Sequence, residues 1–309
     1  MTRQQPLSLG SFNDRFAAMY SSGRALLSAD GEPVTVYDMG GNGPALLLGH
    51  GNGLNAGMWF GVVPLLQEHF RCFGVDLRGH GANRPINPDY SVDRFRLGQD
   101  VIAAVNAIGE PVVYAGHSLG GASGVFAALQ DHNIFTSMWL YEPVVIPDWL
   151  DRSSPPSALL EAAKRRRSVF ASEQEAYDRF RVKPPFDGCA PEAVAAYVRI
   201  GTRPVDGADP VPPELDKGEA VALSCRPADE ARVFGSGQPI DFARLEAITM
   251  PAVVVAGADT GDVHAIPAQM AKPIADALGN ARYVVAEGLG HFGPMEAPSD
   301  VAQMVITHC

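Results

Sequence analysis

Short hydrophobic runs with few charges recur along the chain, and stretches of helical character separate them. The runs are rich in Val, Leu, Phe and Tyr, which is typical of strands buried on both faces. The predicted strands span residues 33–39, 44–50, 70–77, 111–117, 136–143, 251–257 and 281–288. Alternating strands and helices predict an α/β fold with a mostly parallel central sheet and helices on both faces. Functional loops are expected at the carboxyl ends of its strands.

The pattern changes between Pro147 and Arg244. Strand-type runs are missing there, helical pieces take their place, and prolines cluster in the segments KPPF and DPVPPEL. Large apolar residues such as Phe170 and Tyr197 argue against a long disordered loop. We therefore predict a core domain made of residues 1–146 and 245–309, interrupted by a helical insertion of residues 147–244.

The strand predicted at 111–117 runs directly into the pentapeptide GHSLG, residues 116–120. A reversal of the chain within about four residues requires small neighbours, which explains the glycines on either side of Ser118. The turn leaves the hydroxyl exposed at its tip. This G-x-S-x-G pattern resembles the nucleophile elbow of the α/β-hydrolase superfamily, which implies Ser118 as the nucleophile and the insertion as a helical cap over the active site.

A serine hydroxyl needs a base within hydrogen-bonding reach. His291 follows the last predicted strand and precedes the closing helix, where the superfamily carries its base. The segment GHGNG, residues 49–53, resembles the superfamily's oxyanion loop. The resemblance implies that the backbone N–H groups of Asn52 and Leu119 stabilise the tetrahedral intermediate.

The acid of the triad departs from the superfamily pattern. Members usually carry an aspartate three residues after a glycine that ends a late strand, but Thr260 stands three residues after Gly257. Asp259 is one position early and Asp262 is two positions late. Glu142 ends an earlier strand from which some members, including lactonases of fungal toxins, take their acid. Asp259 is favoured because it lies closest to the strand end, and the other two stay open.

The composition of the chain limits which partners, cellular locations and cofactors are expected. The formal net charge is -11, and the single basic cluster, KRRR at 164–167, is short and reads as a solvated helix face, so no nucleic-acid partner is expected. No apolar run approaches the roughly 18 residues of a membrane span. The scattered cysteines and the lack of a secretion signal predict free thiols and a cytoplasmic protein. No cofactor motif or metal-ligand spacing is seen.

The expected activity is that of a serine hydrolase cleaving a small-molecule carboxylic ester or lactone through an acyl-enzyme. Trp59 and Phe292 adjoin catalytic loops and are expected to line the substrate pocket. Carbon–carbon bond hydrolases and cofactor-free haloperoxidases share the fold and stay as alternatives, as does a weakly catalytic small-molecule receptor. Dehalogenases and epoxide hydrolases of this fold are disfavoured because they carry an aspartate where this chain has Ser118. The sequence leaves a homodimer open.

Overall fold

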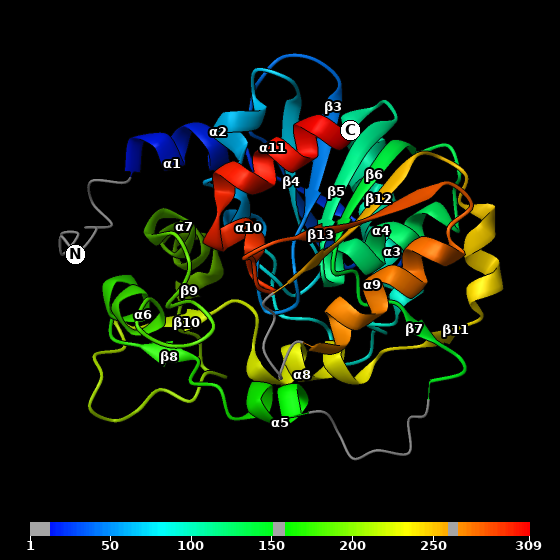
Figure 1. Cartoon of the computed structure of the whole chain (residues 1–309). Helices are drawn as coiled ribbons and strands as arrows, with labels where there is room; N and C mark the ends of the chain where they lie inside the picture. Colours follow the sequence, from blue (N-terminus) through cyan, green and yellow to red (C-terminus); the bar gives the residue numbers. More distant parts are fainter. Residues whose placement is uncertain (1–12, 151–157, 259–264) are drawn as a thin grey trace.

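The computed structural model describes residues 13–150, 158–258 and 265–309, and an eight-stranded sheet forms its centre (Figure 1). In sheet order the strands are β1 (Arg24–Leu27), β2 (Pro33–Asp38), β4 (Arg71–Asp76), β3 (Ala45–Gly49), β5 (Val112–His117), β6 (Phe135–Tyr141), β12 (Ala252–Gly257) and β13 (Ala281–Ala286). Neighbours from β4 to β13 are parallel, whereas β2 is antiparallel to β1 and β4. The seven predicted strands are confirmed. The sequence analysis missed β1, a short and mostly exposed edge strand.

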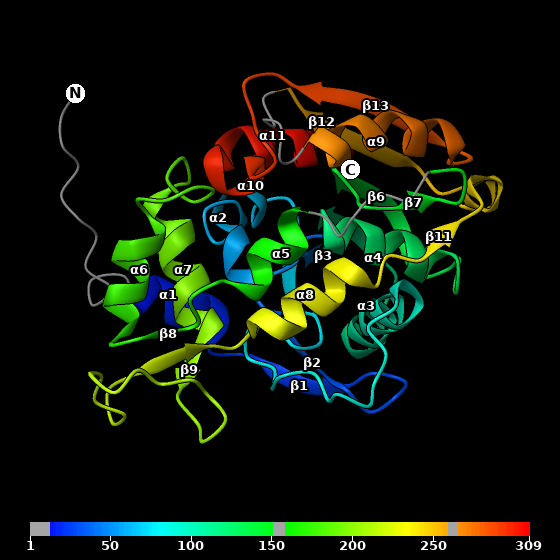
Figure 2. The same ribbon diagram turned by 90° about the horizontal axis from the view of Figure 1, so that it is seen from below.

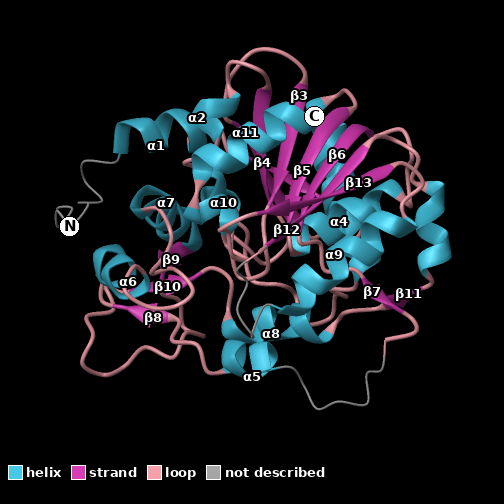
Figure 3. Cartoon of the chain, in the orientation of Figure 1, coloured by secondary structure: helices cyan, strands magenta, loops and turns pink. Residues whose placement is uncertain are grey.

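Successive side chains of each central strand enter two different hydrophobic cores, because strand side chains alternate between the faces of a sheet. In β3, Leu46 and Leu48 join one core, and Ala45 and Leu47 join the other. The first core is closed by α1 (Asn13–Tyr20), α2 (Val63–Leu66), α10 (Gly293–Glu296) and α11 (Pro298–His308). The second is closed by α3 (Arg94–Ile108), α4 (Leu119–Ala128) and α9 (Ala265–Ala277), so helices cover both faces (Figure 3).

The described residues of the segment predicted as an insertion form four helices, and the segment lies to one side of the sheet (Figures 1 and 2). The helices are α5 (Ala158–Lys164), α6 (Glu173–Phe180), α7 (Pro191–Gly201) and α8 (Pro227–Gly235). The 3-10 helix η2 (Ala56–Trp59) of the core packs against α7, and a second 3-10 helix, η3 (Phe242–Ala247), leads back toward β12. Whether 147 and 244 are the domain boundaries stays a prediction.

The expectation that this segment lacks strands was wrong. A small antiparallel sheet holds β8 (Val169–Phe170), β10 (Val221–Leu223) and β9 (Thr202–Pro204), and β7 (Ile146–Pro147) pairs with β11 (Pro239–Ile240). Strands of two or three residues are too short to show the alternation of apolar and polar residues by which a strand is predicted from sequence. Their partners lie up to about a hundred residues away in the sequence, so pairing in space rather than local pattern forms them.

The four cysteines are free thiols, as expected. Within the described ranges, no helix combines the length and the apolar character that crossing a membrane requires.

Candidate active site

Ser118 occupies the turn between β5 and α4 with φ 52° and ψ -109°, a conformation that L residues rarely adopt. The turn is crowded on all sides. A Cβ on Gly120 would lie 2.4 Å from the carbonyl carbon of Gly49, and one on Gly116 would lie 2.7 Å from the amide nitrogen of Gly121. Both flanking glycines are therefore required by backbone contacts, and Ser118 is held in a strained turn at the carboxyl edge of the sheet.

His291 lies in the loop between β13 and α10, and its Nδ1 is within hydrogen-bonding distance of Oε2 of Glu142. The other carboxylate oxygen, Oε1, accepts the backbone N–H of Gly257 at 2.8 Å. Glu142 is fully buried and, with Ser118, is one of two non-glycine residues with positive φ in the described chain. A carboxylate on Nδ1 favours the tautomer in which Nδ1 carries the proton and Nε2 can act as a base.

Among the described residues, the carboxylate of Glu142 contacts His291. The sequence favoured Asp259 as the acid. Asp259 and Asp262 lie outside the described residues. The glycine from which the usual aspartate position was counted, Gly257, donates its N–H to Glu142, so the end of β12 contributes to binding this carboxylate.

Two side chains join the elbow to the histidine loop. His117, the residue before Ser118, donates from Nε2 to the carbonyl of His291 at 2.8 Å, and the centroids of the two imidazole rings lie 4.7 Å apart. The backbone carbonyl of Tyr141 accepts the N–H of Ser118 at 2.9 Å, and the side-chain hydroxyl of Tyr141 donates to the carbonyl of Gly290 at 2.6 Å. Burial, with the nearby carboxylates of Glu142 and Glu296, raises the pKa of Tyr141, so its hydroxyl remains a donor.

The loop after β3, residues 50–55, is called the oxyanion loop here, by its resemblance to that of the superfamily. In the part of the chain that the structure describes, the backbone N–H groups of Asn52 and Leu119 donate to no protein acceptor. Their neighbours are fixed: Gly53 donates to Nε2 of His80 at 3.1 Å, and Gly120 donates to the carbonyl of His50 at 2.8 Å. The two predicted donors are thus available to a bound oxygen, and their role stays a prediction.

His50 and His80 act as structural hydrogen-bonding groups. His50 is fully buried, donates from Nδ1 to the carbonyl of Gly51 at 2.8 Å, and accepts the N–H of Leu77 on Nε2 at 3.0 Å. Burial, with His80 and His117 nearby, holds the pKa of His50 well below its usual range, and burial also lowers that of His80. Both rings are therefore neutral, and both nitrogens of His50 are engaged in fixing the loop.

The two predicted pocket residues have different surroundings. Trp59, the last residue of η2, is fully buried in the first core. Phe292 is only partly buried, and its ring meets those of His291 and Phe186 edge-on at 5.7 and 5.8 Å. Phe186 in turn stacks on Tyr197 at 5.0 Å. An aromatic wall therefore extends from the histidine into the insertion, and the assignment of Trp59 and Phe292 to the substrate pocket stays a prediction.

The basic cluster KRRR is a solvated face only in part. Lys164, the last residue of α5, and Arg165 are exposed, whereas Arg166 and Arg167 turn inward onto carboxylates of the insertion. Arg166, with a side chain only 18% exposed, pairs with Glu230 at 2.8 Å, and Arg167 pairs with Glu175 at 2.8 Å. The pairing of Arg166 with Glu230 was not predicted, because the two residues lie 64 positions apart and no periodicity connects them.

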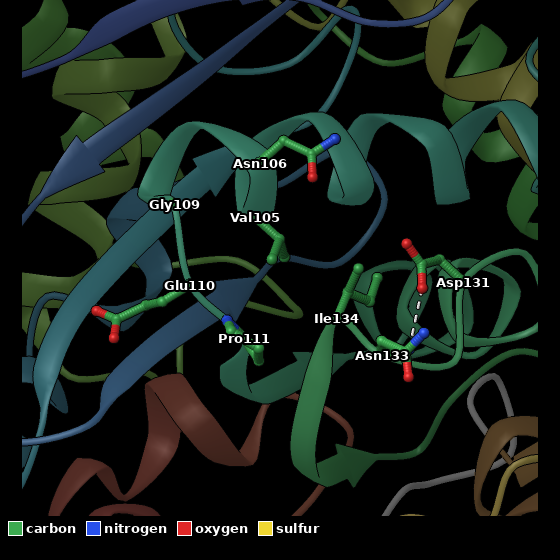
Figure 4. Close-up of a pocket in the computed structure, with 8 residues that line it drawn as sticks. All are labelled: Val105, Asn106, Gly109, Glu110, Pro111, Asp131, Asn133 and Ile134. Carbon is green, nitrogen blue, oxygen red and sulfur yellow. Dashed lines mark hydrogen bonds between the residues drawn. The ribbon is translucent and has the colours of Figure 1, made fainter.

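A hollow of about 310 Å³ opens at the opposite edge of the sheet, between the end of α3 and the amino ends of β5 and β6 (Figure 4). Its ionisable lining residues are Glu110 and Asp131, and Asp131 already accepts the N–H of Asn133 at 3.0 Å. Its lining contains no serine, cysteine or histidine, so the candidate triad lies elsewhere, at the carboxyl edge of the sheet.

Known proteins with similar sequences support the same fold. The chain is 27% identical over 292 residues to a fluoroacetate dehalogenase from a Burkholderia species, covering 86% of this chain and 87% of the relative. Matches to an uncharacterized Mycobacterium tuberculosis protein, 39% identical over 94 residues, and to the pimeloyl-[acyl-carrier protein] methyl ester esterase of Nitrosomonas europaea, 40% identical over 90 residues, are local. They span 30% and 29% of this chain, and 27% and 33% of those relatives.

Among solved structures, E-2-(acetamidomethylene)succinate hydrolase superposes with a TM-score of 0.71 at 18% identity, covering 93% of this chain and 98% of that one. A family model described as the alpha/beta hydrolase family matches residues 46–304, a range that includes the central sheet from β4 to β13 and the elbow, oxyanion and histidine loops. On that match, the chain belongs to the alpha/beta hydrolase family.

Proposed function

We propose that this hydrolase cleaves a small-molecule carboxylic ester or lactone through an acyl-enzyme. Ser118 is the nucleophile, His291 the general base and Glu142 the acid that orients it. The observation that carries the proposal is the contact between Oε2 of Glu142 and Nδ1 of His291, in a carboxylate whose second oxygen is already bound by Gly257. A buried carboxylate held this way supports the imidazole when it becomes charged.

The reaction proceeds in two halves. The Oγ of Ser118 attacks the ester carbonyl and gives its proton to Nε2 of His291, and the N–H groups of Asn52 and Leu119 bind the oxyanion that forms. The tetrahedral intermediate collapses as His291 protonates the alcohol oxygen; the alcohol of an ester departs, whereas that of a lactone stays attached to the acyl group. Water then attacks the acyl-enzyme, with His291 as the base, and the carboxylic acid is released as Ser118 recovers its proton.

The insertion supplies the roof of the site in this proposal. Phe292, Phe186 and Tyr197 form a continuous aromatic wall beside His291. Aromatic and aliphatic groups pack against such surfaces because burial removes apolar area from water. The preferred substrate is therefore an ester or lactone whose acyl or alcohol portion is apolar.

The test combines labelling with turnover. A fluorophosphonate probe is expected to label wild-type protein at Ser118, and p-nitrophenyl esters of increasing acyl length and lactones of increasing ring size are expected to be hydrolysed with different kcat/KM values. Ser118→Ala is the control for both. Absence of labelling and of turnover in the wild type would favour the ligand receptor, whereas labelling with turnover only of a vinylogous diketone would favour carbon–carbon bond hydrolysis.

A further inference from the structure

The insertion reaches the oxyanion loop through the side chains of two asparagines. The Nδ2 group of Asn52 donates to the carbonyl of Glu230 in α8 at 3.1 Å. The Nδ2 group of Asn55 donates to the carbonyl of Tyr197 in α7 at 2.9 Å. The oxyanion loop is thus hydrogen-bonded to two separate helices of the insertion, to α8 through Asn52 and to α7 through Asn55.

A single guanidinium connects the same two residues of the insertion. Arg166 pairs through Nη1 with Oε2 of Glu230 at 2.8 Å and donates from Nη2 to the hydroxyl of Tyr197. Its guanidinium carbon also lies 5.4 Å from the ring centroid of Phe180. The side chains of the ion pair are 18% and 11% exposed, so solvent screens the pair far less than it screens a surface ion pair.

The ion pair also touches the loop itself. A Cβ on Gly53 would lie 2.6 Å from Oε1 of Glu230 and 3.2 Å from Nη1 of Arg166. Gly53 follows Asn52 and has a φ of 72°, and Gly51 precedes it. Because glycines on both sides give the loop little stiffness of its own, the direction of the Asn52 N–H depends on its outside contacts.

We propose that Arg166 is a positioning residue for the oxyanion hole. By joining Glu230 to Tyr197, it fixes the spacing of the two carbonyls that hold Asn52 and Asn55, and so holds the Asn52 N–H toward the reacting carbonyl. The inference rests on the proposed function, in which that N–H stabilises the oxyanion. A preorganised donor acts mainly on the transition state, so the loss of Arg166 lowers kcat more than it raises KM.

The chain offers a matched control for this role. Arg203, in β9, has a side chain 19% exposed and pairs with Asp209 at 2.7 Å, so its burial and pairing resemble those of Arg166. Its hydrogen bonds go to Pro204 and Asp209, within the insertion and away from the oxyanion loop. Arg166→Met and Arg203→Met each remove a part-buried guanidinium and keep an unbranched side chain, but only the first disconnects Glu230 from Tyr197.

Kinetics on p-nitrophenyl esters separate the two variants. Arg166→Met is expected to lower kcat about 10-fold or more, with KM changed by less than about 3-fold, because small displacements of a catalytic group have large effects on rate. The rate of fluorophosphonate labelling should fall in parallel. Arg203→Met should lower the thermal midpoint about as much as Arg166→Met does, but should leave kcat within about 2-fold of the wild-type value. The proposal would be overturned if kcat fell equally in both variants, or if Arg166→Met raised KM without lowering kcat.

Hydrogen exchange tests the link without relying on turnover. The amides of Gly53 and Leu54 are hydrogen-bonded in the loop, and we expect Arg166→Met, but not Arg203→Met, to raise their exchange rates about 10-fold or more. If the wild type neither reacts with the probe nor hydrolyses esters, the proposed function fails, while exchange still decides whether Arg166 holds the loop. Unchanged exchange in Arg166→Met contradicts the inference.

A milder variant covers the case in which Arg166→Met does not fold. Tyr197→Phe removes only the hydroxyl that accepts from Arg166 and keeps the ring stacked on Phe186. We expect it to lower kcat about 3-fold or more and to raise exchange at Gly53, with KM nearly constant. The proposal would be overturned if Tyr197→Phe kept both the wild-type kcat and the wild-type rate of amide hydrogen exchange at Gly53.

Discussion

Oε2 of Glu142 lies within hydrogen-bonding distance of Nδ1 of His291, although 149 positions separate the two residues in the chain. Glu142 is the first residue after β6, and its backbone N–H donates to the carbonyl of Val255 in the neighbouring strand at 2.8 Å. Its φ of 46° turns the chain at that point. The carboxylate is therefore fixed by β6 and β12 together before it meets the histidine loop.

Replacing Glu142 by glutamine tests which carboxylate is the acid. The amide keeps the shape of the side chain but no longer supports the charged imidazole, so kcat should fall by about 10⁴-fold, the scale of the corresponding change in serine proteases. Asp259→Asn and Asp262→Asn serve as comparisons, each with kcat and thermal midpoint measured. If Glu142→Gln kept a near wild-type kcat and Asp259→Asn lost most of its kcat, Asp259 rather than Glu142 would be the acid of the triad.

Ser118→Ala is expected to abolish ester hydrolysis and fluorophosphonate labelling without loss of structure. The hydroxyl of Ser118 does not cap α4, and alanine keeps the Cβ that the elbow already accommodates at positive φ. Circular dichroism and thermal midpoint should match those of the wild type within a few degrees. Turnover that persists in the purified variant would show that another group acts as the nucleophile.

Gly120→Ala should destabilise the protein by about 3 kcal/mol or more, because its Cβ would lie 2.4 Å from a backbone carbon of β3 that has little freedom to move. Gly188→Ala is the matched control, since nothing lies within 4 Å of a Cβ at that exposed position, and its effect should stay within about 0.5 kcal/mol. Urea unfolding measures both. Similar stabilities for the two variants would contradict the close approach of elbow and β3.

The buried His50 predicts an acid-sensitive stability. Because burial holds its folded-state pKa well below 6.5, the unfolded chain binds one more proton than the folded chain between these values. The contribution of His50 to the free energy of unfolding is therefore greatest above about pH 6.5, and it falls by up to about 1.4 kcal/mol for each pH unit below that value.

Urea unfolding of wild type and His50→Gln at several pH values between 5 and 8 measures this contribution. Glutamine does not titrate, so the stability of His50→Gln should be lower at pH 8 and should depend less steeply on pH below 6.5. Parallel pH dependences in the two proteins would mean that His50 takes up no extra proton on unfolding.

The sequence by itself determined seven of the eight strands of the central sheet and the turn at Ser118. Strands buried on both faces must be apolar along their whole length, so β3, β5 and β12 appear in the sequence as uncharged runs. Gly116, beside Ser118, was equally readable, because the backbone of Gly121 in the same turn excludes a side chain there. These are local requirements, and local sequence expresses them.

Only the tertiary structure decided which groups meet across the chain. Glu142 meets His291 because β6 and β12 are neighbours in the sheet and the histidine loop passes over their ends. Arg166 left the predicted solvated face because Glu230 and Tyr197, 64 and 31 positions away, offered a buried charge partner and a hydroxyl. A buried charge must find its partner in space, and no pattern of neighbours in the sequence specifies where that partner lies.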